Sequence, residues 1–381
     1  MKILLLSAYD ADSHRYWREH LVANFPEHQW TVLSLPGRYF SWRIRGNSLS
    51  WAFGEQSEKL KRQYDLVIAT SMTDLSSLRG FIPSLASIPT LVYFHENQFD
   101  SPATERARKN VEPQILNIYT ALAADKLAFN SQYNLDTFIE GARALLKKLP
   151  DQVPTNIATL LSAKSQVLPV PLSRDETGTT ATLPQIPWDK YQQQKIDSRP
   201  LLIAWAARWE YDKGPQRLLA IVQQLESTNI DYRLCIMGQK FRQVPLEFEQ
   251  LQQHFGHRID QFGYAQSAIE YRAWLRRADI FLSTAVHEFQ GLAVLEAVAQ
   301  NCVPILPKRL VYPELFSDEY LYSSEPSIPA EANSAVDLIK KQRLALVESS
   351  VIRLDMNLYW EQLKPKYAQL MTETSSVNTN K

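Results

Sequence analysis

Two glutamates eight positions apart, Glu288 and Glu296, lie around the start of a short apolar segment in the C-terminal half of the chain. The segment reads H-E-F-Q-G-L-A-V-L-E-A-V-A from His287, which predicts a turn at Glu288 and a helix that Gly291 opens. Anions bind at helix N-termini, and ligands bind at the carboxyl ends of strands in open α/β sheets. The spacing suits a ligand with hydroxyl groups at both ends and phosphates between them. It equally suits a capping acid followed by a partly solvated helix residue.

Two cations, Arg208 and Lys213, come just before another predicted helix and follow a predicted strand over 200–206. A pair of positive side chains beside a helix N-terminus suits a diphosphate. An isolated Arg–Lys pair is more often a solvated surface loop. The pair becomes informative because the two glutamates follow it in the same half of the chain.

In the N-terminal half, a predicted strand over 90–94 ends in His95-Glu96-Asn97-Gln98. A single histidine is usually a buried residue with satisfied hydrogen bonds, but its place at a strand end favours a functional role. The sequence contains no G-x-x-x-x-G-K-[ST], G-x-G-x-x-G or G-x-S-x-G motif, and no zinc-site spacing. P-loop phosphoryl transfer, standard dinucleotide binding, serine hydrolysis and zinc chemistry are therefore poorly supported.

The stretch over 37–53 mixes arginines with aromatic side chains and is typical of neither a clear helix nor a strand. The arginines are Arg38, Arg43 and Arg45. Arginines beside aromatic rings suit phosphate contacts and stacking on unpaired bases. The alternative is an amphipathic loop that docks on its own domain, with Trp42 and Trp51 as anchors. We expect Trp51 to belong to the core.

The bulk composition excludes few functions. The 381 residues carry a formal net charge of zero, so a nucleic-acid binder of this composition would need a local basic patch. Cys235 and Cys302 lie in apolar runs, which predicts buried free thiols in a reducing compartment. No apolar run reaches the ~18–20 residues that span a bilayer. The apolar N-terminus runs into polar residues without a cleavage-like context, so we expect a cytoplasmic protein.

The elements that must position these residues alternate between short apolar strands and helices, and the pattern occurs twice. This predicts an α/β fold with two tandem Rossmann-like domains whose strand ends face each other across a cleft. We expect an acceptor domain over 1–172, a linker over 173–199 and a nucleotide-sugar domain over 200–350. A C-terminal helix over 351–372 should pack back on the first domain, and 373–381 should form a disordered tail.

The motifs together resemble a known family. Arg208, Lys213-Gly214, F-G-Y from Phe262 and the segment from His287 look like retaining nucleotide-sugar glycosyltransferases of the GT-B architecture. W-R-I-R-G from Trp42, with Y-F-H-E-N-Q and F-N-S at two strand ends, is similar to the tRNA-queuosine mannosyltransferase family. D-A-D-S-H replaces a Gly-Gly-Ser-His loop of that family, and F-D-S-P replaces a shorter aromatic-Pro turn. These departures leave the donor motifs intact and concern the acceptor side.

This resemblance implies transfer of mannose from GDP-mannose to queuosine at the wobble position of tRNA-Asp, with retention of configuration. Arg208 and Lys213 would neutralise the diphosphate, helped by backbone N–H groups of the helix after Gly291. Glu296 would accept the ribose hydroxyls, Glu288 would bind the 3- or 4-hydroxyl of the sugar, and His95 would lie near its 6-hydroxyl. The leaving diphosphate would take the acceptor proton, so the resemblance implies no metal, cofactor or protein nucleophile.

Three sets of residues follow from the resemblance. Catalysis is assigned to His95, Glu288, Arg208 and Lys213. Donor contacts are assigned to Arg208, Lys213, Gly238, Gly263, Tyr264, Glu288, Phe289, Gly291, Leu292 and Glu296. Contacts to the tRNA anticodon loop are assigned to Ser13, His14, Trp42, Arg43, Arg45, Glu96, Asn97, Gln98, Asn130 and Ser131.

Two other functions remain open at this point. One is a retaining hexosyltransferase that acts on a glycan or a lipid-linked acceptor. The other is a non-catalytic module that binds a sugar nucleotide or RNA, in which Glu288→Ala would change nothing measurable. The sequence also leaves open the donor base, the exact hexose and the oligomeric state.

Overall fold

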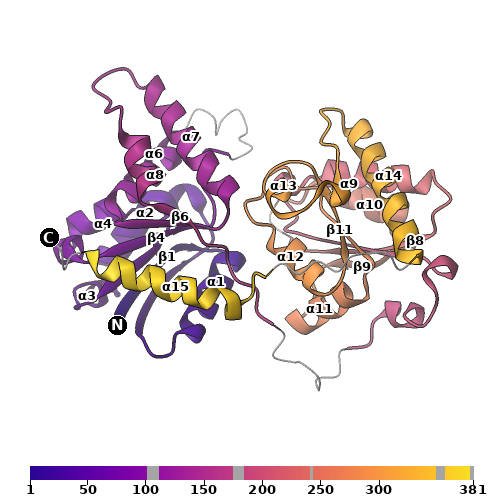
Figure 1. The fold of residues 1–381 in the computed structure, drawn as a ribbon, viewed down its shortest axis with the longest axis horizontal. Helices are drawn as coiled ribbons and strands as arrows, with labels where there is room; N and C mark the ends of the chain where they lie inside the picture. The colour runs from indigo at the N-terminus through magenta and orange to yellow at the C-terminus, as the bar shows by residue number, and fades with distance from the viewer. Residues whose placement is uncertain (101–110, 175–183, 241–242, 349–356, 378–381) are drawn as a thin grey trace. The chain divides into compact units, whose positions relative to one another are not determined.

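The computed structural model describes residues 1–100, 111–174, 184–240, 243–348 and 357–377. The chain forms two compact units, drawn in Figure 1. Unit 1 comprises Met1–Arg174 with Leu358–Lys381, and unit 2 comprises Asp175–Asn357. Each unit contains a six-stranded sheet in which all strand pairs are parallel.

The sheet of unit 1 has the order β2-β1-β3-β4-β5-β6. Its strands are β1 Lys2–Asp10, β2 Gln29–Pro36, β3 Leu66–Thr70, β4 Thr90–Phe94, β5 Lys126–Phe129 and β6 Ser165–Val167. Its helices are α1 Asp12–Asn24, α2 Phe40–Phe53, α3 Ser57–Leu60, α4 Leu75–Phe81, η1 Pro83–Ser87, α6 Glu112–Ala123, α7 Gln132–Lys148, α8 Ile157–Ala163 and α15 Trp360–Ser375. Strands β3 and β4 are buried along their whole length, as expected for parallel strands covered on both faces.

The sheet of unit 2 has the order β12-β11-β10-β7-β8-β9. Its strands are β7 Leu201–Ala206, β8 Tyr232–Met237, β9 Ile259–Gly263, β10 Ile280–Leu282, β11 Val303–Pro307 and β12 Leu321–Tyr322. Its helices are η2 Pro187–Tyr191, η3 Ile196–Ser198, η4 Tyr211–Lys213, α9 Pro215–Glu226, α10 Leu246–Phe255, η5 Gly256–Arg258, α11 Ala268–Arg277, α12 Leu292–Ala299, α13 Tyr312–Leu315, η6 Asp318–Tyr320 and α14 Ile328–Val347. Counted from β7, this is the Rossmann order 3-2-1-4-5-6, whose direction reverses between β7 and β10.

The predicted α/β class with two Rossmann-like domains is confirmed, but the stretch over 37–53 differs from its interpretation. Most of it is helix α2. Ile44, Asn47, Ser48 and Trp51 form its buried face at helical spacing. Because two of these four residues are polar, the apolar pattern that signals a helix is hidden in the sequence. Trp51 lies in the core, as expected.

The range expected to be a linker packs in part on unit 2. Trp188 in η2 is fully buried, and its indole donates to Asp260 with a distance of 2.8 Å. Its ring contacts Trp274 edge to face at 5.0 Å between centroids. Residues 175–183 of that range lie outside the described residues.

The C-terminal helix α15 belongs to unit 1, where it lies against β3 and β4 (Figure 1). It buries Leu363, Tyr367 and Leu370. It continues to Ser375, so its last turn lies within the range expected to be a tail. The first residues of the predicted helix, 351–356, and the end of the tail, 378–381, lie outside the described residues.

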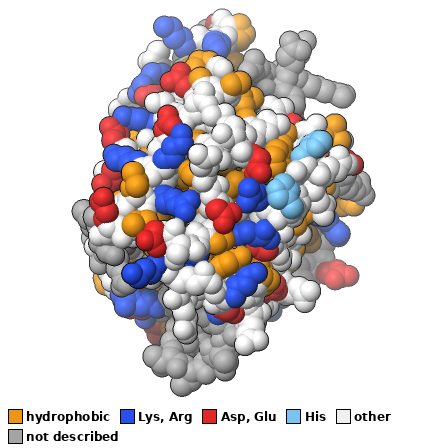
Figure 2. All heavy atoms as spheres, turned by 90° about the vertical axis from the view of Figure 1, so that its right-hand side faces the viewer, with side chains coloured by type: hydrophobic (Ala, Val, Ile, Leu, Met, Phe, Trp, Pro, Cys, Tyr) orange, Lys and Arg blue, Asp and Glu red, His pale blue; other side chains and the backbone are white. Residues whose placement is uncertain are grey.

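Charged side chains of both signs are interspersed over the face seen in Figure 2, in keeping with a formal net charge of zero. Cys235 and Cys302 are buried free thiols, as predicted. Among the helices of the described residues, none combines the length and the apolar character that a bilayer span requires.

Candidate active site

The loop after β7 brings Lys213 to the end of β10. Gly214 adopts a left-handed conformation with φ 66° and precedes Pro215, the first residue of α9. A Cβ atom at Gly214 would lie 2.0 Å from the carbonyl oxygen of Thr284, so only glycine fits this close approach. Thr284 in turn donates from its hydroxyl to the carbonyl of Lys213 at 2.8 Å. The loops after the two strands at the switch point are thereby joined.

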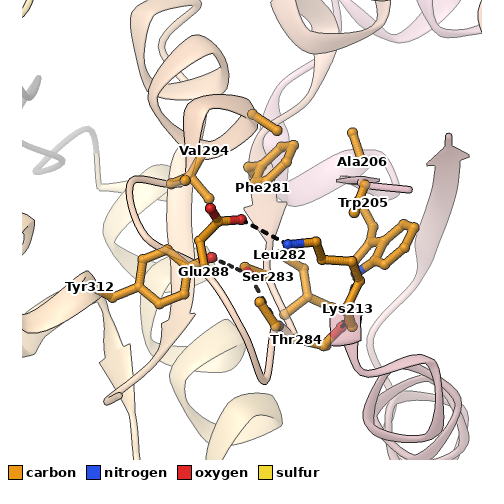
Figure 3. A pocket seen from close by; sticks show the side chains of 14 residues that line it. Trp205, Ala206, Lys213, Phe281, Leu282, Ser283, Thr284, Glu288, Val294 and Tyr312 are labelled. Carbon is orange, nitrogen blue, oxygen red and sulfur yellow. Dashed lines mark hydrogen bonds and ion pairs between the residues drawn. The ribbon is translucent and has the colours of Figure 1, made fainter. Parts of the chain in front are cut away.

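Lys213 and Glu288 form a partly buried ion pair at this point (Figure 3). The Nζ of Lys213 lies 3.2 Å from Oε2 of Glu288 and donates to the carbonyl of His287 at 2.9 Å. Burial raises the pKa of Glu288, but Lys213 and the N–H of Gly291 outweigh it and hold that pKa at about 2. Burial likewise opposes the charge of Lys213, yet Glu288 and Asp212 raise its pKa above the ordinary value. Both side chains are therefore charged at neutral pH.

A small pocket of about 20 Å³ lies beside this pair. Figure 3 shows Tyr312, Val294 and Phe281 around the carboxylate of Glu288, with Trp205 on the side of Lys213. The pocket thus combines apolar walls with one cation and one carboxylate. Its volume corresponds to a water-sized group, so it can hold one small polar group of a ligand by a few directed contacts.

Two acidic residues that the sequence interpretation passed over, Glu210 and Asp212, surround the cations. Arg208 contacts Glu210 at 2.8 Å and Asp212 at 3.6 Å, and Lys213 contacts Asp212 at 3.3 Å. The side chain of Arg208 is nevertheless 45% exposed. The loop is therefore a charge-compensated cluster in which an anionic ligand must compete with protein carboxylates. The sequence could have indicated them, because both lie between Arg208 and Lys213 in the same loop.

The N-terminus of α12 already holds one carboxylate. Glu288 accepts from the N–H of Phe289 at 3.1 Å and from that of Gln290 at 3.5 Å, and the N–H of Gly291 also bonds to it. These N–H groups lie before the helix and are used by the protein itself. The first N–H groups within α12, from Leu292 onward, have no intrahelical acceptor and remain the donors that a helix N-terminus can offer.

Glu296, in the second turn of α12, is bonded to a different helix. Its carboxylate accepts from the hydroxyl of Tyr271 on α11 at 3.0 Å, a partner that the sequence interpretation missed. Gly238 and Gly263 meet at the edge of the sheet through an N–H to O=C bond of 3.1 Å. Tyr264, the next residue, is 67% exposed. The carboxyl ends of β8 and β9 thus lie side by side.

A second buried cluster supports the loop that carries Glu288. Glu331 on α14 is fully buried and bonds to Arg309 at 2.8 and 3.0 Å and to Arg217 at 3.1 Å. Arg309 also donates from Nε to the carbonyl of Ala285 at 2.8 Å. These contacts hold the backbone just before Glu288.

In unit 1, His95 follows β4 and is enclosed by aromatic rings. It stacks on His14 from α1 with centroids 4.2 Å apart, and Trp17 meets it edge-on at 4.9 Å. Burial, together with His14, lowers the pKa of His95 well below 6.5, so the ring is neutral at pH 7. Within the described residues, Nε2 of His95 has no hydrogen-bond partner.

Three of the predicted acceptor residues use their side chains to hold this region together. Asn97 donates to both the backbone and the side-chain oxygen of Asn134 at 3.0 and 2.9 Å. Asn130 donates to the carbonyl of His95 at 2.8 Å, and Ser131 caps α7 by accepting from the N–H of Asn134 at 3.0 Å. All three are buried. They shape the loop around His95, and the sequence did not single out Asn134 at their centre.

Most of the other acceptor candidates are more accessible. Ser13 is exposed on α1, and Glu96 and Gln98 are half-buried after β4. Trp42 on α2 is 55% exposed, whereas Arg43 next to it is buried. Helix α2 therefore carries all three of these candidates, but Trp42 and Arg45 are exposed and Arg43 is buried.

Within the ranges that the structure describes, no group of three or more His, Cys, Asp or Glu residues is arranged to hold a metal ion.

Comparison with known proteins identifies both halves of the chain. Residues 2–172 match the family model described as tRNA-queuosine alpha-mannosyltransferase N-terminal, and residues 188–349 match glycosyl transferases group 1. A Drosophila melanogaster protein named tRNA-queuosine alpha-mannosyltransferase is 31% identical over 334 residues, or 86% of this chain and 84% of the fly protein. The chain belongs to the tRNA-queuosine alpha-mannosyltransferase family. The family resemblance and the glycosyltransferase class expected from the sequence are confirmed.

Solved structures share the fold at much lower identity. The sucrose-phosphate synthase of Thermosynechococcus elongatus has a TM-score of 0.65 and 14% identity, with 98% of this chain and 99% of that one covered. Anabaena HepE in complex with UDP and glucose has a TM-score of 0.62 and 13% identity, covering 98% and 100%. These likenesses show the GT-B fold, with its two Rossmann-like domains. In this fold the switch point of unit 2 carries Lys213 and Glu288.

Proposed function

We propose that the chain transfers mannose from GDP-mannose to queuosine at the wobble position of tRNA-Asp and retains the anomeric configuration. The observation that carries the donor half is the Lys213–Glu288 pair beside a pocket at the switch point of unit 2. The acceptor half is supported by the family model that matches nearly all of unit 1 before α15.

The proposed chemistry is electrostatic. Lys213, protonated and buried, offers a fixed positive charge to the diphosphate as negative charge grows on it, and Arg208 adds a second, more exposed cation. Glu288, ionised and oriented by backbone N–H groups, accepts a hydrogen bond from a sugar hydroxyl. Glu296 accepts from the ribose. The leaving diphosphate takes the acceptor proton.

For His95 we propose a contact to the 6-hydroxyl of the sugar. As a neutral ring with an unpartnered Nε2 among the described residues, it can form a hydrogen bond without bringing a charge. We also propose that the reaction takes place in the cytoplasm and needs no metal or cofactor. Activity in the presence of EDTA should equal activity without it.

The direct test is incubation with GDP-mannose and queuosine-containing tRNA-Asp, followed by mass spectrometry of the nucleosides. We expect one hexose added to queuosine, and no addition to tRNA that carries guanine at the wobble position. Transfer to a glycan or lipid without any addition to tRNA would instead support the alternative hexosyltransferase.

A thermal-shift series identifies the donor. The melting temperature should rise most with GDP-mannose, compared with UDP- and ADP-sugars at the same concentration, because a ligand that binds only the folded state stabilises it by mass action. A larger shift with a UDP-sugar would contradict the proposed donor.

A further inference from the structure

Within the part of the chain that the structure describes, the N-terminus of helix α2 has no acidic residue in its first turn and no capping side chain. The helix starts at Phe40 after Tyr39, which adopts a left-handed conformation with φ 57°. The N–H groups of a first turn lack intrahelical acceptors and carry a partial positive charge. This end of α2 is therefore suited to an anion, although a helix end alone does not make a site.

The second observation is Arg43, in the first turn and a half of the same helix. Arg43 is only 9% exposed, and within the described residues its Nε has no hydrogen-bond partner. Burial and the neighbouring cation Arg38 both lower its pKa. Side chains on a helix lean toward its N-terminus, which directs Arg43 toward the uncapped end.

Arg45, two positions further along α2, is neutralised by two carboxylates. It contacts Asp74 at 3.1 Å and Glu112 at 2.8 Å, and both contacts raise its pKa. Among the described residues, no carboxylate compensates Arg43 in this way, although a buried charge without a partner is costly. A ligand anion would supply the partner that the described residues do not.

Two aromatic rings are exposed at the same end of α2. Tyr39 is 62% exposed and lies 5.5 Å from the guanidinium of Arg38, and Trp42 is 55% exposed. The ring of Trp42 lies against the helix over Gly46, where an added Cβ would come within 2.3 Å of it. One face of the ring is thus held by the helix. Exposed rings beside arginines are the arrangement that binds unpaired bases together with their phosphates.

We propose that Arg38, Arg43 and the N-terminus of α2 bind one backbone phosphate of single-stranded RNA, and that Tyr39 and Trp42 stack on the adjoining bases. The inference rests on the proposed function, because it takes the RNA to be the tRNA acceptor. It adds a defined phosphate site and excludes Arg45, whose charge is already neutralised within unit 1.

The test uses the full chain with Arg43→Met and an unmodified tRNA-Asp transcript, with binding measured across a salt series. We expect a roughly tenfold loss of affinity. The slope of log affinity against log salt should fall by about 0.7, which corresponds to one single-strand phosphate. The melting temperature of the free protein should stay the same or rise, because the substitution removes an uncompensated buried charge. A purely structural arginine would show the opposite thermal effect.

Arg62→Met is the matched control, because it removes one positive charge from an exposed side chain of unit 1. It should leave affinity and slope close to wild type. Arg38→Gln, at an exposed position, should also lower the slope, and it decides the question even if Arg43→Met does not fold. The shift in melting temperature caused by GDP-mannose should be unchanged in all three variants.

The outcomes separate this inference from the proposed function. If Arg38→Gln and a folded Arg43→Met bind tRNA with the wild-type slope while the enzyme still adds a hexose to queuosine, the phosphate site is wrong and the function stands. If the wild-type protein does not bind tRNA but binds vesicles of anionic phospholipid through Arg43, both the RNA site and the proposed acceptor are overturned.

Discussion

The loops at the carboxyl ends of the two sheets bury different kinds of polar group. In unit 2 the loops after β7 and β10 hold charges in compensated pairs, with Lys213 between Asp212 and Glu288. In unit 1 the loops after β4 and β5 hold neutral groups, chiefly buried asparagines around a neutral His95. The one buried cation at that end that lacks a partner within the described residues is Arg43.

This difference indicates how the loops of each unit can bind an anionic ligand. A compensated cluster can exchange a protein carboxylate for a phosphate without creating an unpaired charge. A neutral scaffold with one uncompensated arginine gains a partner when an anion arrives.

Lys213→Ala removes the fixed cation of unit 2. We expect the rate of transfer to queuosine to fall by about 10²–10³-fold, the usual cost of losing one group that stabilises a developing negative charge. The rate is measured from the hexose added to tRNA under saturating donor. Lys308→Ala, at a half-exposed lysine paired with Asp318 in the same unit, should have little effect. A loss below tenfold for Lys213→Ala would remove the charge pair from the catalytic mechanism.

The charge of Glu288 should make the stability of the protein depend on pH. Its pKa is about 2 in the folded protein against an ordinary value of 4.5. Its contribution is therefore fully present above pH ~4.5 and is lost as the pH falls toward 2, with a total of roughly 3 kcal/mol. Urea unfolding of wild type and Glu288→Gln should show a difference that shrinks between pH 6 and pH 3. A constant difference over that range would contradict the ion pair.

Tyr367→Phe tests the network of neutral buried hydrogen bonds in unit 1. The hydroxyl of Tyr367 accepts from the indole of Trp17 at 3.1 Å and donates to the carbonyl of Pro169 at 3.0 Å. Trp17 in turn packs on His95. Because these groups are buried, loss of the hydroxyl should lower the free energy of unfolding by about 1–3 kcal/mol at both low and neutral pH. Tyr119→Phe, at an exposed ring, serves as the control.

Arg45→Gln should have the smallest effect. Its side chain is 43% exposed, so loss of its ion pairs should lower the free energy of unfolding by no more than about 1 kcal/mol. The salt slope of tRNA binding should match wild type. If Arg45→Gln lowered that slope as much as Arg43→Met, the contrast between a paired and an unpaired arginine on α2 would be lost.

Much of the scaffold could be predicted from local sequence. Strand β4 matches its predicted range and β7 begins one residue later than predicted; both were recognisable because strands buried on both faces appear as continuous apolar runs. Helix α12 was recognisable because Gly291 precedes an apolar run of helical length. Helix α2 was not, since Asn47 and Ser48 lie on its buried face. Asn47 is satisfied there by the carbonyl of Met72 and the N–H of Asp74, which no local pattern reveals.

The site residues also divide into those that local sequence identifies and those whose contacts depend on the fold. Arg208, Lys213, Glu288 and Glu296 were chosen by type and position, and the structure places Lys213 against Glu288 but Glu296 against Tyr271. Asp212 and Glu210 were missed because a carboxylate in a loop has no distinctive spacing. Asn97, Asn130 and Ser131 were assigned to the acceptor, yet their side chains bond within unit 1.

The sequence by itself determined the family, the two Rossmann-like domains and the motifs at their strand ends, because these depend on residue type and on short spacings. The tertiary structure alone decided which charges are paired. Lys213 and Glu288 are far apart in the chain and meet only because β7 and β10 are neighbours at the switch point of the sheet. The same dependence on distant neighbours makes Arg45 a paired surface arginine and leaves Arg43, two residues away, buried without a partner among the described residues.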